Sequence, residues 1–274
     1  MPPTTRTPRR RTGGHTRENL AARRHTEILR RLAAAPAVGV AELSAFFAVS
    51  RETIRRDLKA LARRGALSVV HGGATRRETH EPALDHRAAE NAAGKAAIGR
   101  LAAGLVQDGM VVLLDSGTTT LAIAHALRER RELTICTGSL AIAQLLCRVP
   151  GFRVYLFGGE VDANDEATTG IDVIDAVGRF RVDIAFLGGG GITADGEVTD
   201  YRRAGAELRS RMIAAATQAW FVLDRSKFGR LTPARIAAFW TAHGLVVDAP
   251  LPVPAQEALA ARGLRVLVTA DGSR

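Results

Sequence analysis

The sequence predicts an α/β protein in which a small amino-terminal helix-turn-helix domain precedes a larger domain built on a parallel sheet. The first observation is charge: residues 1–80 carry 17 Arg and Lys against 6 Asp and Glu, whereas the remaining residues carry 21 against 22. The second is an amphipathic basic helix that follows a shorter helix after a tight turn. The third is an alternation of apolar strands and helices after residue 90, which is typical of a parallel sheet covered on both faces.

Residues 1–16 are rich in Pro, Thr and Arg, and the sequence predicts a disordered basic arm there. The arm lacks the apolar core of a signal peptide, and no segment of the sequence approaches a membrane span. Cys136 and Cys147 have no CxxC spacing and fall in apolar surroundings, so both are expected in the core. The seven histidines form no ligand cluster. A reduced, cytoplasmic protein with no metal, other cofactor or membrane partner is therefore expected.

Two helices at helix-turn-helix spacing are expected next. Residues 40–47 predict a short helix, residues 48–49 leave only a tight turn, and Ser50 is a natural N-cap for the following helix. The apolar stripe of this second helix recurs at i, i+4 and i+7, at Ile54, Leu58 and Leu61. Basic side chains occupy its exposed side, so the second helix is suited to enter a major groove of DNA.

The residues expected to contact DNA fall into two groups. Thr53, Arg55 and Arg56 lie early in the second helix, where side chains reach base edges, although Thr53 is also the N3 residue of the helix. Phosphate contacts are expected from Arg51, Lys59 and Arg63. A charged helix face is often merely solvated, but the turn spacing and the regional charge favour DNA.

A short apolar strand over residues 66–70 is followed by paired glycines, which is the pattern of the wing of a winged helix. His71 lies between the strand and the glycines and is a further candidate for contact with DNA. Since one winged helix rarely reads enough base pairs, a homo-oligomer is expected.

Between residues 75 and 90 the sequence loses periodicity and becomes charged, which predicts a linker to a domain over residues 91–274. In that domain strands are expected at 110–114, 133–137, 153–157, 182–187, 219–223, 244–247 and 264–268. Helices are expected at 92–106, 119–129, 140–148, 170–178, 202–217 and 254–262. Residues 234–243 fit neither pattern.

The loop Asp115–Thr120 directly follows a buried strand and opens a helix. Its small residues let backbone N–H groups approach an anion, its hydroxyls can donate hydrogen bonds, and the helix N-terminus adds positive potential. Ordinary N-capping is the alternative for an isolated loop of this kind. Other polar or glycine-rich loops follow other strands, at 137–139, 158–160, 188–191 and 224–228. Because parallel strands end at one edge of a sheet, a shared phosphate-binding pocket is expected there.

The amino-terminal motifs resemble those of the DeoR family of bacterial transcriptional regulators. The resemblance is carried by Val49-Ser50, Thr53–Leu58, Gly65, Leu67 and His71–Ala74. It implies that residues 17–74 form a winged helix-turn-helix domain that binds operator DNA. It also implies a repressor of sugar catabolism.

The larger domain resembles the carboxyl-terminal sensor domain of the same family, which is similar in fold to ribose-5-phosphate isomerase. The match includes Gly170, Asp183, Asp224 and Ser226–Phe228 as well as the effector-binding positions that the resemblance implies. Those positions are Lys95, Asp115, Ser116, Gly117, Thr118, Thr119, Thr137, Ser139, Gly158, Gly159 and Lys227.

By that resemblance, Gly117–Thr119, Lys95 and Lys227 hold the phosphate of a phosphorylated sugar effector, and Asp115 accepts hydrogen bonds from sugar hydroxyls. Gly138 stands where the family usually has Asn. An amide able to contact the effector is therefore absent at this position.

The alternative function is a sugar-phosphate isomerase-like enzyme fused to a DNA-binding domain. Isomerisation needs carboxylates that move a proton between adjacent carbons. Alignment with the similar isomerases places Leu187, Gly190 and Ser210 where these acids would be, so no enzyme is expected. Three acids nearby in the sequence keep the alternative open: Asp195, Glu197 and Glu207. A nicotinamide-dependent oxidoreductase is disfavoured, because the first βα turn lacks GxGxxG.

Overall fold

The computed structural model describes residues 14–34, 37–63, 66–70, 72–76, 81–193 and 195–270. The chain divides into two compact units, residues 1–77 (unit 1) and 78–274 (unit 2), and each has its own apolar core. Among the sequence predictions, Gly65, His71 and most of the basic arm lie outside the described residues. None of the helices described is long and apolar enough to cross a membrane.

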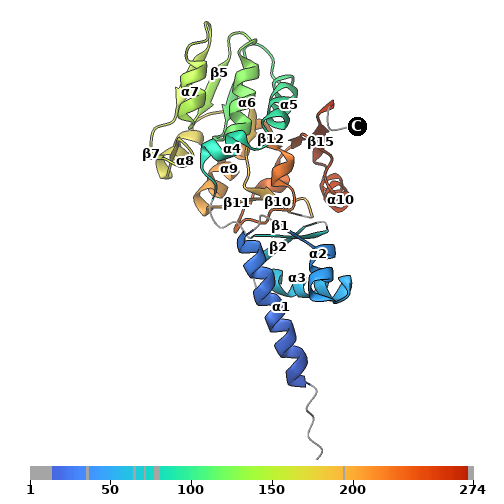
Figure 1. The fold of residues 1–274 in the computed structure, drawn as a ribbon. Helices are drawn as coiled ribbons and strands as arrows, with labels where there is room; N and C mark the ends of the chain where they lie inside the picture. The colour runs from blue at the N-terminus through green and yellow to red at the C-terminus, as the bar shows by residue number, and fades with distance from the viewer. Residues whose placement is uncertain are drawn as a thin grey trace, which may run out of the picture. The chain divides into compact units, whose positions relative to one another are not determined.

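Unit 1 is the blue part of the ribbon in Figure 1. Its elements are α1 (Gly14–Ala34), β1 (Ala37–Gly39), α2 (Val40–Phe47), α3 (Arg51–Arg63), β2 (Leu67–Val70) and β3 (Gly73–Arg76). The expected helix-turn-helix is present as α2 and α3, and Ala48 makes the turn in the left-handed region with φ 51°. The strands form an antiparallel sheet in the order β1-β3-β2. Helix α1, which begins within the expected arm, and strand β1 were not predicted.

The core of unit 1 explains why α3 keeps one face free. Ile54, Leu58 and Leu61 are buried, as their spacing predicts, and they pack with Ile28 of α1 and Leu43 of α2. The opposite side of α3 is exposed. The helix is therefore anchored by its apolar stripe while its basic side chains remain in solvent.

One buried acid ties α3 to α1. Asp57 is 7% exposed, and its carboxylate accepts a hydrogen bond from Arg24 Nε at 2.8 Å and lies 3.0 Å from His25 Nε2. Asp57→Ala should lower the free energy of unfolding of unit 1 by about 2 kcal/mol, because it leaves Arg24 without its partner. Chemical denaturation followed by circular dichroism measures this change. Glu52→Ala removes an exposed acid from the same helix, and an equal loss in that variant would contradict the role of Asp57.

Unit 2 is built on a seven-stranded parallel sheet in the order β15-β14-β12-β9-β4-β5-β6. The strands are β4 (Val111–Leu114), β5 (Thr134–Thr137), β6 (Arg153–Leu156), β9 (Val182–Leu187), β12 (Ala216–Leu223), β14 (Gly244–Val247) and β15 (Arg265–Val268). The helices are α4 (Leu84–Ala89), α5 (Ala92–Ala103), α6 (Thr118–Leu127), α7 (Leu140–Leu146), α8 (Ile171–Val177), α9 (Arg203–Ala215) and α10 (Val253–Ala261). All seven strands agree with the sequence prediction to within a few residues.

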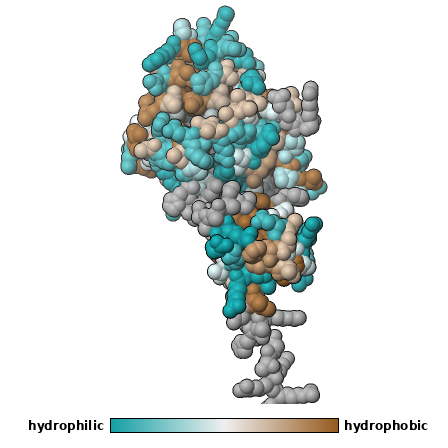
Figure 2. Space-filling model, viewed as in Figure 1, coloured by the Kyte–Doolittle hydropathy of each residue, from teal (hydrophilic) through white to brown (hydrophobic). Residues whose placement is uncertain are grey.

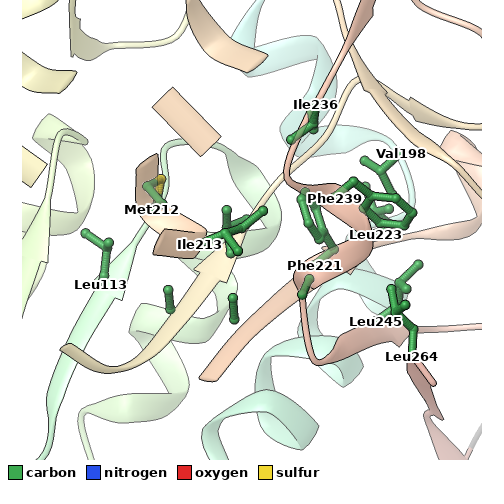
Figure 3. Close-up of a cluster of buried hydrophobic side chains, with 14 of the residues drawn as sticks. Leu113, Val198, Met212, Ile213, Phe221, Leu223, Ile236, Phe239, Leu245 and Leu264 are labelled. Carbon is green, nitrogen blue, oxygen red and sulfur yellow. The ribbon is translucent and has the colours of Figure 1, made fainter. Parts of the chain in front are cut away.

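The centre of the sheet is buried on both faces because its central strands are mostly apolar. In β9, Ile184 and Phe186 pack into a cluster with residues of α5, α6 and α7, whereas Ala185 and Leu187 pack into the cluster of α8, α9 and α10. Figure 3 shows part of the second cluster, in which Phe221 and Phe239 meet edge to face with centroids 5.2 Å apart. Successive strand residues point to opposite faces, so continuous apolar runs produce two cores.

Several short elements were not predicted. They are the hairpin of β7 (Glu160–Asp162) and β8 (Ala167–Thr169), the antiparallel sheet of β10 (Gly191–Ile192), β11 (Val198–Asp200) and β13 (Ala234–Arg235), and the 3₁₀ turns η1 (Arg225–Lys227) and η2 (Phe239–Thr241). The unassigned segment 234–243 contains β13 and η2. Strands of two or three residues are too short to show a period in the sequence.

The segment 75–90, predicted as a linker, contains helix α4, whose Arg87 is 6% exposed and makes charged contacts within unit 2 that leave no apolar period. The prediction that both cysteines lie in the core is wrong for one of them. Cys136 is buried, and burial raises the pKa of its thiol to about 12, but Cys147 is exposed at the end of α7. The apolar neighbours of Cys147 belong to the buried side of that helix, and the cysteine itself does not.

Hydrophilic residues cover most of the face of unit 2 that is visible in Figure 2, and hydrophobic residues appear there in scattered groups.

Candidate functional site: an anion pocket and a basic helix

The pocket of unit 2 lies at the point where the order of the strands in the sheet reverses. Strands β5 and β6 lie on one side of β4, and β9 and the later strands lie on the other. The loops after β4 and β9 therefore separate in opposite directions at the carboxyl edge of the sheet, which is where sheets of this kind bind ligands. Glu81, Arg87, Ser116–Thr120, Gly188, Gly189, Arg209, Val222, Leu223 and Lys227 line this pocket.

The loop after β4 presents its backbone to the pocket. Gly117 has φ 128°, a value that residues other than glycine rarely adopt, and it forms the N-cap of α6. Thr118 and Thr119 follow as the first helical residues, so their N–H groups have no partner within the helix. This end of the helix therefore offers both donors and positive potential to an anion.

Lys227 brings a positive charge to the same pocket. It belongs to η1, which Asp224 caps by accepting a hydrogen bond from Ser226 N at 3.0 Å. Lys227 is 8% exposed, and within the part of the chain that the structure describes its ammonium group makes no hydrogen bond or ion pair. Burial lowers the pKa of Lys227, and the charge of Arg230 acts in the same direction. The site thus holds a buried amine that the carboxylates of Glu81 and Asp224 favour in its charged form but that makes no direct ion pair with the described residues.

Arg209 of α9 brings a further cation to the pocket, with a side chain that is 14% exposed. Its Nε lies 2.8 Å from Asp115 Oδ2 and donates to the carbonyl oxygen of Gly188 at 2.9 Å, and its Nη1 pairs with Asp200. Burial acts to lower the pKa of Arg209, but Asp115 and Asp200 outweigh it and the pKa is raised. The guanidinium group is therefore permanently charged and held in one orientation.

The carboxylate of Asp115 makes its contacts with other protein groups and not with the open space of the pocket. Oδ1 accepts a hydrogen bond from Ser116 N at 2.8 Å, and Oδ2 accepts one from Gly188 N at 2.9 Å in addition to its contact with Arg209. Burial raises the pKa of Asp115, while Arg209 opposes that change. Its geometry makes it an anchor for Arg209 and for the loops after β4 and β9.

Lys95 lies outside the pocket lining. Its Nζ donates to the carbonyl oxygens of Arg87 and Glu90, the latter at 2.6 Å, and lies 3.9 Å from Asp224 Oδ2. Burial lowers the pKa of Lys95. In this arrangement the ammonium group caps the end of α4 and supports the turn that follows it.

The loops after β5 and β6 also lie outside the pocket lining. Thr137 Oγ1 accepts a hydrogen bond from Ser139 N at 3.0 Å, and Ser139 Oγ caps α7 at Ile142 N. Gly158 and Gly159 belong to one loop. A Cβ atom at Gly159 would lie 2.8 Å from the carbonyl oxygen of Thr169. These residues shape the carboxyl edge of the sheet on the far side of β4.

The presence of glycine at position 138 has a local structural explanation. A Cβ atom at this position would lie 2.9 Å from Thr168 Oγ1, and the Thr168 hydroxyl donates to the carbonyl oxygen of Gly138 at 3.2 Å. Both residues line a small cavity beside the pocket, together with Asp115 and Ser116. A threonine hydroxyl therefore occupies the space into which a larger residue at 138 would project.

The run Gly188–Gly191 is explained by packing. Cβ atoms at Gly189 and Gly191 would lie 2.5 Å from side-chain atoms of Val198 and Arg230. The glycines let β10 and β11 approach the sheet closely, which is a structural requirement and not a sign of a dinucleotide site.

The sequence did not single out Arg209, Arg87 or Glu81. Arg209 lies in a helix with many charged neighbours, and the other two lie in the segment predicted to be a linker. The position of Arg209 on the core-facing side of α9 could have indicated a buried role in the sequence. The long apolar stem of arginine often covers such positions while the charged end remains in solvent, so the position alone does not indicate a site.

The exposed side of α3 is the candidate nucleic-acid interface of unit 1. The basic residues expected to contact DNA, Arg51, Arg55, Arg56, Lys59 and Arg63, are all exposed. Ser50 Oγ accepts a hydrogen bond from Thr53 N at 3.1 Å and lies 2.9 Å from the Thr53 hydroxyl, so Thr53 takes part in the N-cap. Arg55 and Arg56 side chains are 59% and 79% exposed, and both lie near Glu52.

A hollow beside α3 is lined by Arg56, Lys59, Ala62, Arg63 and Val69. Three cations around one apolar floor form a surface suited to a sugar-phosphate backbone.

Comparison with known proteins gives matches over both units. The model of the DeoR-like helix-turn-helix domain matches residues 24–80, and that of the DeoR C terminal sensor domain matches residues 90–249. The glycerol-3-phosphate regulon repressor of Escherichia coli K12 is 32% identical over 238 residues, which are 86% of this chain and 94% of that protein. The putative aga operon transcriptional repressor of Escherichia coli O157:H7 is 29% identical over 94% of this chain and 97% of that protein.

Among solved structures, ribose 5-phosphate isomerase A from Methanocaldococcus jannaschii is similar to part of the chain. It is 18% identical with a TM-score of 0.36, and the similarity covers 51% of this chain and 55% of that one.

Proposed function

The chain belongs to the DeoR family of transcriptional regulators, and from this premise we propose that a phosphorylated sugar bound in the pocket of unit 2 controls the affinity of unit 1 for operator DNA. The observation that carries the proposal is the buried ammonium group of Lys227, which makes no hydrogen bond or ion pair with the described residues of unit 2. Burying a charge without a hydrogen-bonded partner is costly, and a phosphate group bound there supplies one.

The geometry of the pocket suits a phosphate in a second way. The N–H groups of Thr118 and Thr119 at the start of α6 and the ammonium group of Lys227 line the same pocket. Charge-assisted hydrogen bonds of this kind are about twice as strong as neutral ones. The hydroxyls of Ser116 and Thr118 remain available for the sugar part of the ligand. The name of the Escherichia coli relative, a repressor of a glycerol-3-phosphate regulon, fits a phosphorylated effector.

DNA binding by unit 1 is the other half of the proposal. We place the basic side of α3 in the major groove, with Arg55 and Arg56 nearest to base edges. A homo-oligomer that presents two such helices reads both halves of a palindromic operator, as other helix-turn-helix proteins do.

The proposal is tested by titrating operator binding with ligand. Full-length protein is mixed with a fluorescent fragment of its own promoter region, and anisotropy is followed as sugar phosphates or their unphosphorylated counterparts are added. Operator affinity should change only with the phosphorylated compounds, because the cations of the pocket recognise the phosphate. An equal response to the unphosphorylated sugars would remove the phosphate role from the pocket.

The acids that an isomerase would need are not at the pocket. Among its described lining residues the acidic side chain belongs to Glu81, and Leu187 is buried in the core. Of the acids that kept the enzyme alternative open, Glu197 pairs with Arg235 at 2.7 Å and Glu207 pairs with Arg211 at 3.5 Å along α9. The chain is therefore a regulator, in agreement with its relatives, which are named as repressors.

Purified protein should not interconvert ribose 5-phosphate with its ketose isomer above the buffer background. The physical reason is the lack of a paired acid and base on opposite sides of a bound substrate. A coupled spectrophotometric assay measures the rate, with a true isomerase as positive control. Turnover that survives repurification and is lost in Asp115→Asn would establish an enzyme instead.

A further inference from the structure

Glu81 places a negative charge in a pocket whose other charged residues are cations. It is the one acid among the described residues that line the pocket, and its side chain is 18% exposed. Glu81 Oε1 lies 2.9 Å from Arg87 Nη1, and that nitrogen would lie 3.9 Å from a Cβ atom at Gly117. The pair of Glu81 and Arg87 thus lies beside the loop that offers N–H donors to an anion.

The charges around Glu81 are the ones that a phosphate would use. Burial is the main cause that raises the pKa of Glu81, and the carboxylate of Asp165 adds to it. Arg87, Arg209 and Lys227 act in the opposite direction and favour the carboxylate form. Glu81 is therefore held by the cationic field of the pocket, although its surroundings are poorly hydrated.

The backbone of Glu81 is also fixed in place. Asn164, in the turn between β7 and β8, donates from Nδ2 to the carbonyl oxygen of Glu81 at 3.3 Å and accepts from Leu84 N at 3.2 Å. Arg87 pairs with Asp165 in the same turn and donates from Nε to the carbonyl oxygen of Pro82 at 2.8 Å. These hydrogen bonds and ion pairs fix the position of Glu81 at the pocket.

Glu81 also lies at the start of unit 2, which begins at residue 78. The segment from residue 81 to α4 carries both Glu81 and Arg87, so it contributes two charged groups to the pocket and leads directly from the end of unit 1. Two charged groups of the pocket therefore lie close in sequence to the boundary between the two units.

We propose that the Glu81 carboxylate is the internal counter-ion of the pocket, and that the effector phosphate displaces it and thereby moves the segment from residue 81 to α4, near the start of unit 2. This inference rests on the proposed function, since it requires an anionic effector. A phosphate dianion and the Glu81 carboxylate cannot share the same poorly hydrated cations without strong repulsion. When Glu81 occupies the cations of the pocket, the apparent affinity for the effector is lower. Because the effector displaces Glu81, effector affinity and DNA affinity become linked.

The test removes the charge of Glu81 and keeps its shape. Glu81→Gln retains a carbonyl oxygen that can accept from Arg87, and it should bind inorganic phosphate about tenfold more tightly than the wild type in isothermal titration calorimetry on the full chain. Asp85→Asn is the matched control, because Asp85 is an exposed acid in the first turn of α4 that does not line the pocket. It should bind phosphate as the wild type does.

A second measurement follows operator affinity without any ligand. Glu81→Gln should shift it in the direction that saturating effector shifts the wild type, because the segment from residue 81 to α4 has lost the charge that attracts it to the cations of the pocket. Glu81→Ala must change both quantities in the same direction as Glu81→Gln, so that the result does not depend on one variant. A thermal melt establishes that each variant is folded.

The outcomes separate this inference from the proposed function. If Lys227→Met loses phosphate binding while Glu81→Gln gains none, the pocket binds anions but the counter-ion role of Glu81 is wrong. If Lys227→Met binds phosphate like the wild type, the proposed function itself fails. An equal gain in Asp85→Asn would reduce the effect to general charge and overturn the inference.

Discussion

Replacing Lys227 by methionine should raise the sugar phosphate concentration needed for a response by about ten- to hundredfold while operator binding without effector stays at the wild-type level. Methionine keeps the apolar stem in its buried position and removes only the ammonium group. The loss of one charge-assisted contact to an anion corresponds to about 1.5 to 3 kcal/mol. Anisotropy of labelled operator, read across an effector titration, gives both quantities in one experiment.

The control for this variant is Arg211→Met. It makes the same change of charge on α9, where the Arg211 side chain is 58% exposed and pairs with Glu207 along the helix. It should respond to effector like the wild type. Because burial already lowers the pKa of Lys227, a melt must show that Lys227→Met is at least as stable as the wild type. A folded Lys227→Met protein that responds at wild-type concentrations would show that the phosphate lies elsewhere.

Arg55→Ala should weaken binding to the operator by about 1 to 3 kcal/mol and reduce the preference for operator over unrelated DNA. The side chain is 59% exposed near the start of α3, and its ion pair with Glu52 spans 3.8 Å at the surface, so its loss should leave the fold intact. Gel shifts at fixed salt, with operator and with a scrambled fragment, measure the preference directly.

Lys59→Ala gives the comparison on the same helix. A residue that binds phosphate should weaken operator and scrambled DNA alike, and the slope of the logarithm of affinity against the logarithm of salt should fall by about 0.9. If Arg55→Ala behaves like Lys59→Ala, Arg55 contacts the backbone and the bases are read by other side chains. Unchanged affinity in Arg55→Ala would remove it from the interface.

The sequence predicted the elements that depend on local pattern. The buried stripe of α3, the N-cap at Ser50 and the turn before it follow from spacing within a few residues, and the structure has all of them. The strands of the main sheet were equally accessible, because a strand buried on both faces is a continuous apolar run. The loop Gly117–Thr119 was identified in the same way, from its place between a buried strand and a helix.

The sequence was less informative where a segment is stabilised by polar contacts. Helix α4 has no apolar period, since Arg87 holds it by ion pairs with Glu81 and Asp165. Lys95 and Lys227 looked alike as isolated lysines near motifs, yet one donates to backbone carbonyl oxygens and the other lines the pocket. Their partners lie far away in the chain, so no local pattern distinguishes them.

By itself the sequence determined that a basic helix at helix-turn-helix spacing precedes a parallel α/β unit with a loop of small and hydroxyl residues after its first strand. The tertiary structure alone decided which other residues join that loop. Because β9 lies between β4 and β12, the loops after these three strands meet, and the loops after β5 and β6 fall on the other side of β4. Strand order depends on packing between residues far apart in the chain, and through it Arg209, Lys227 and Glu81 come to one pocket.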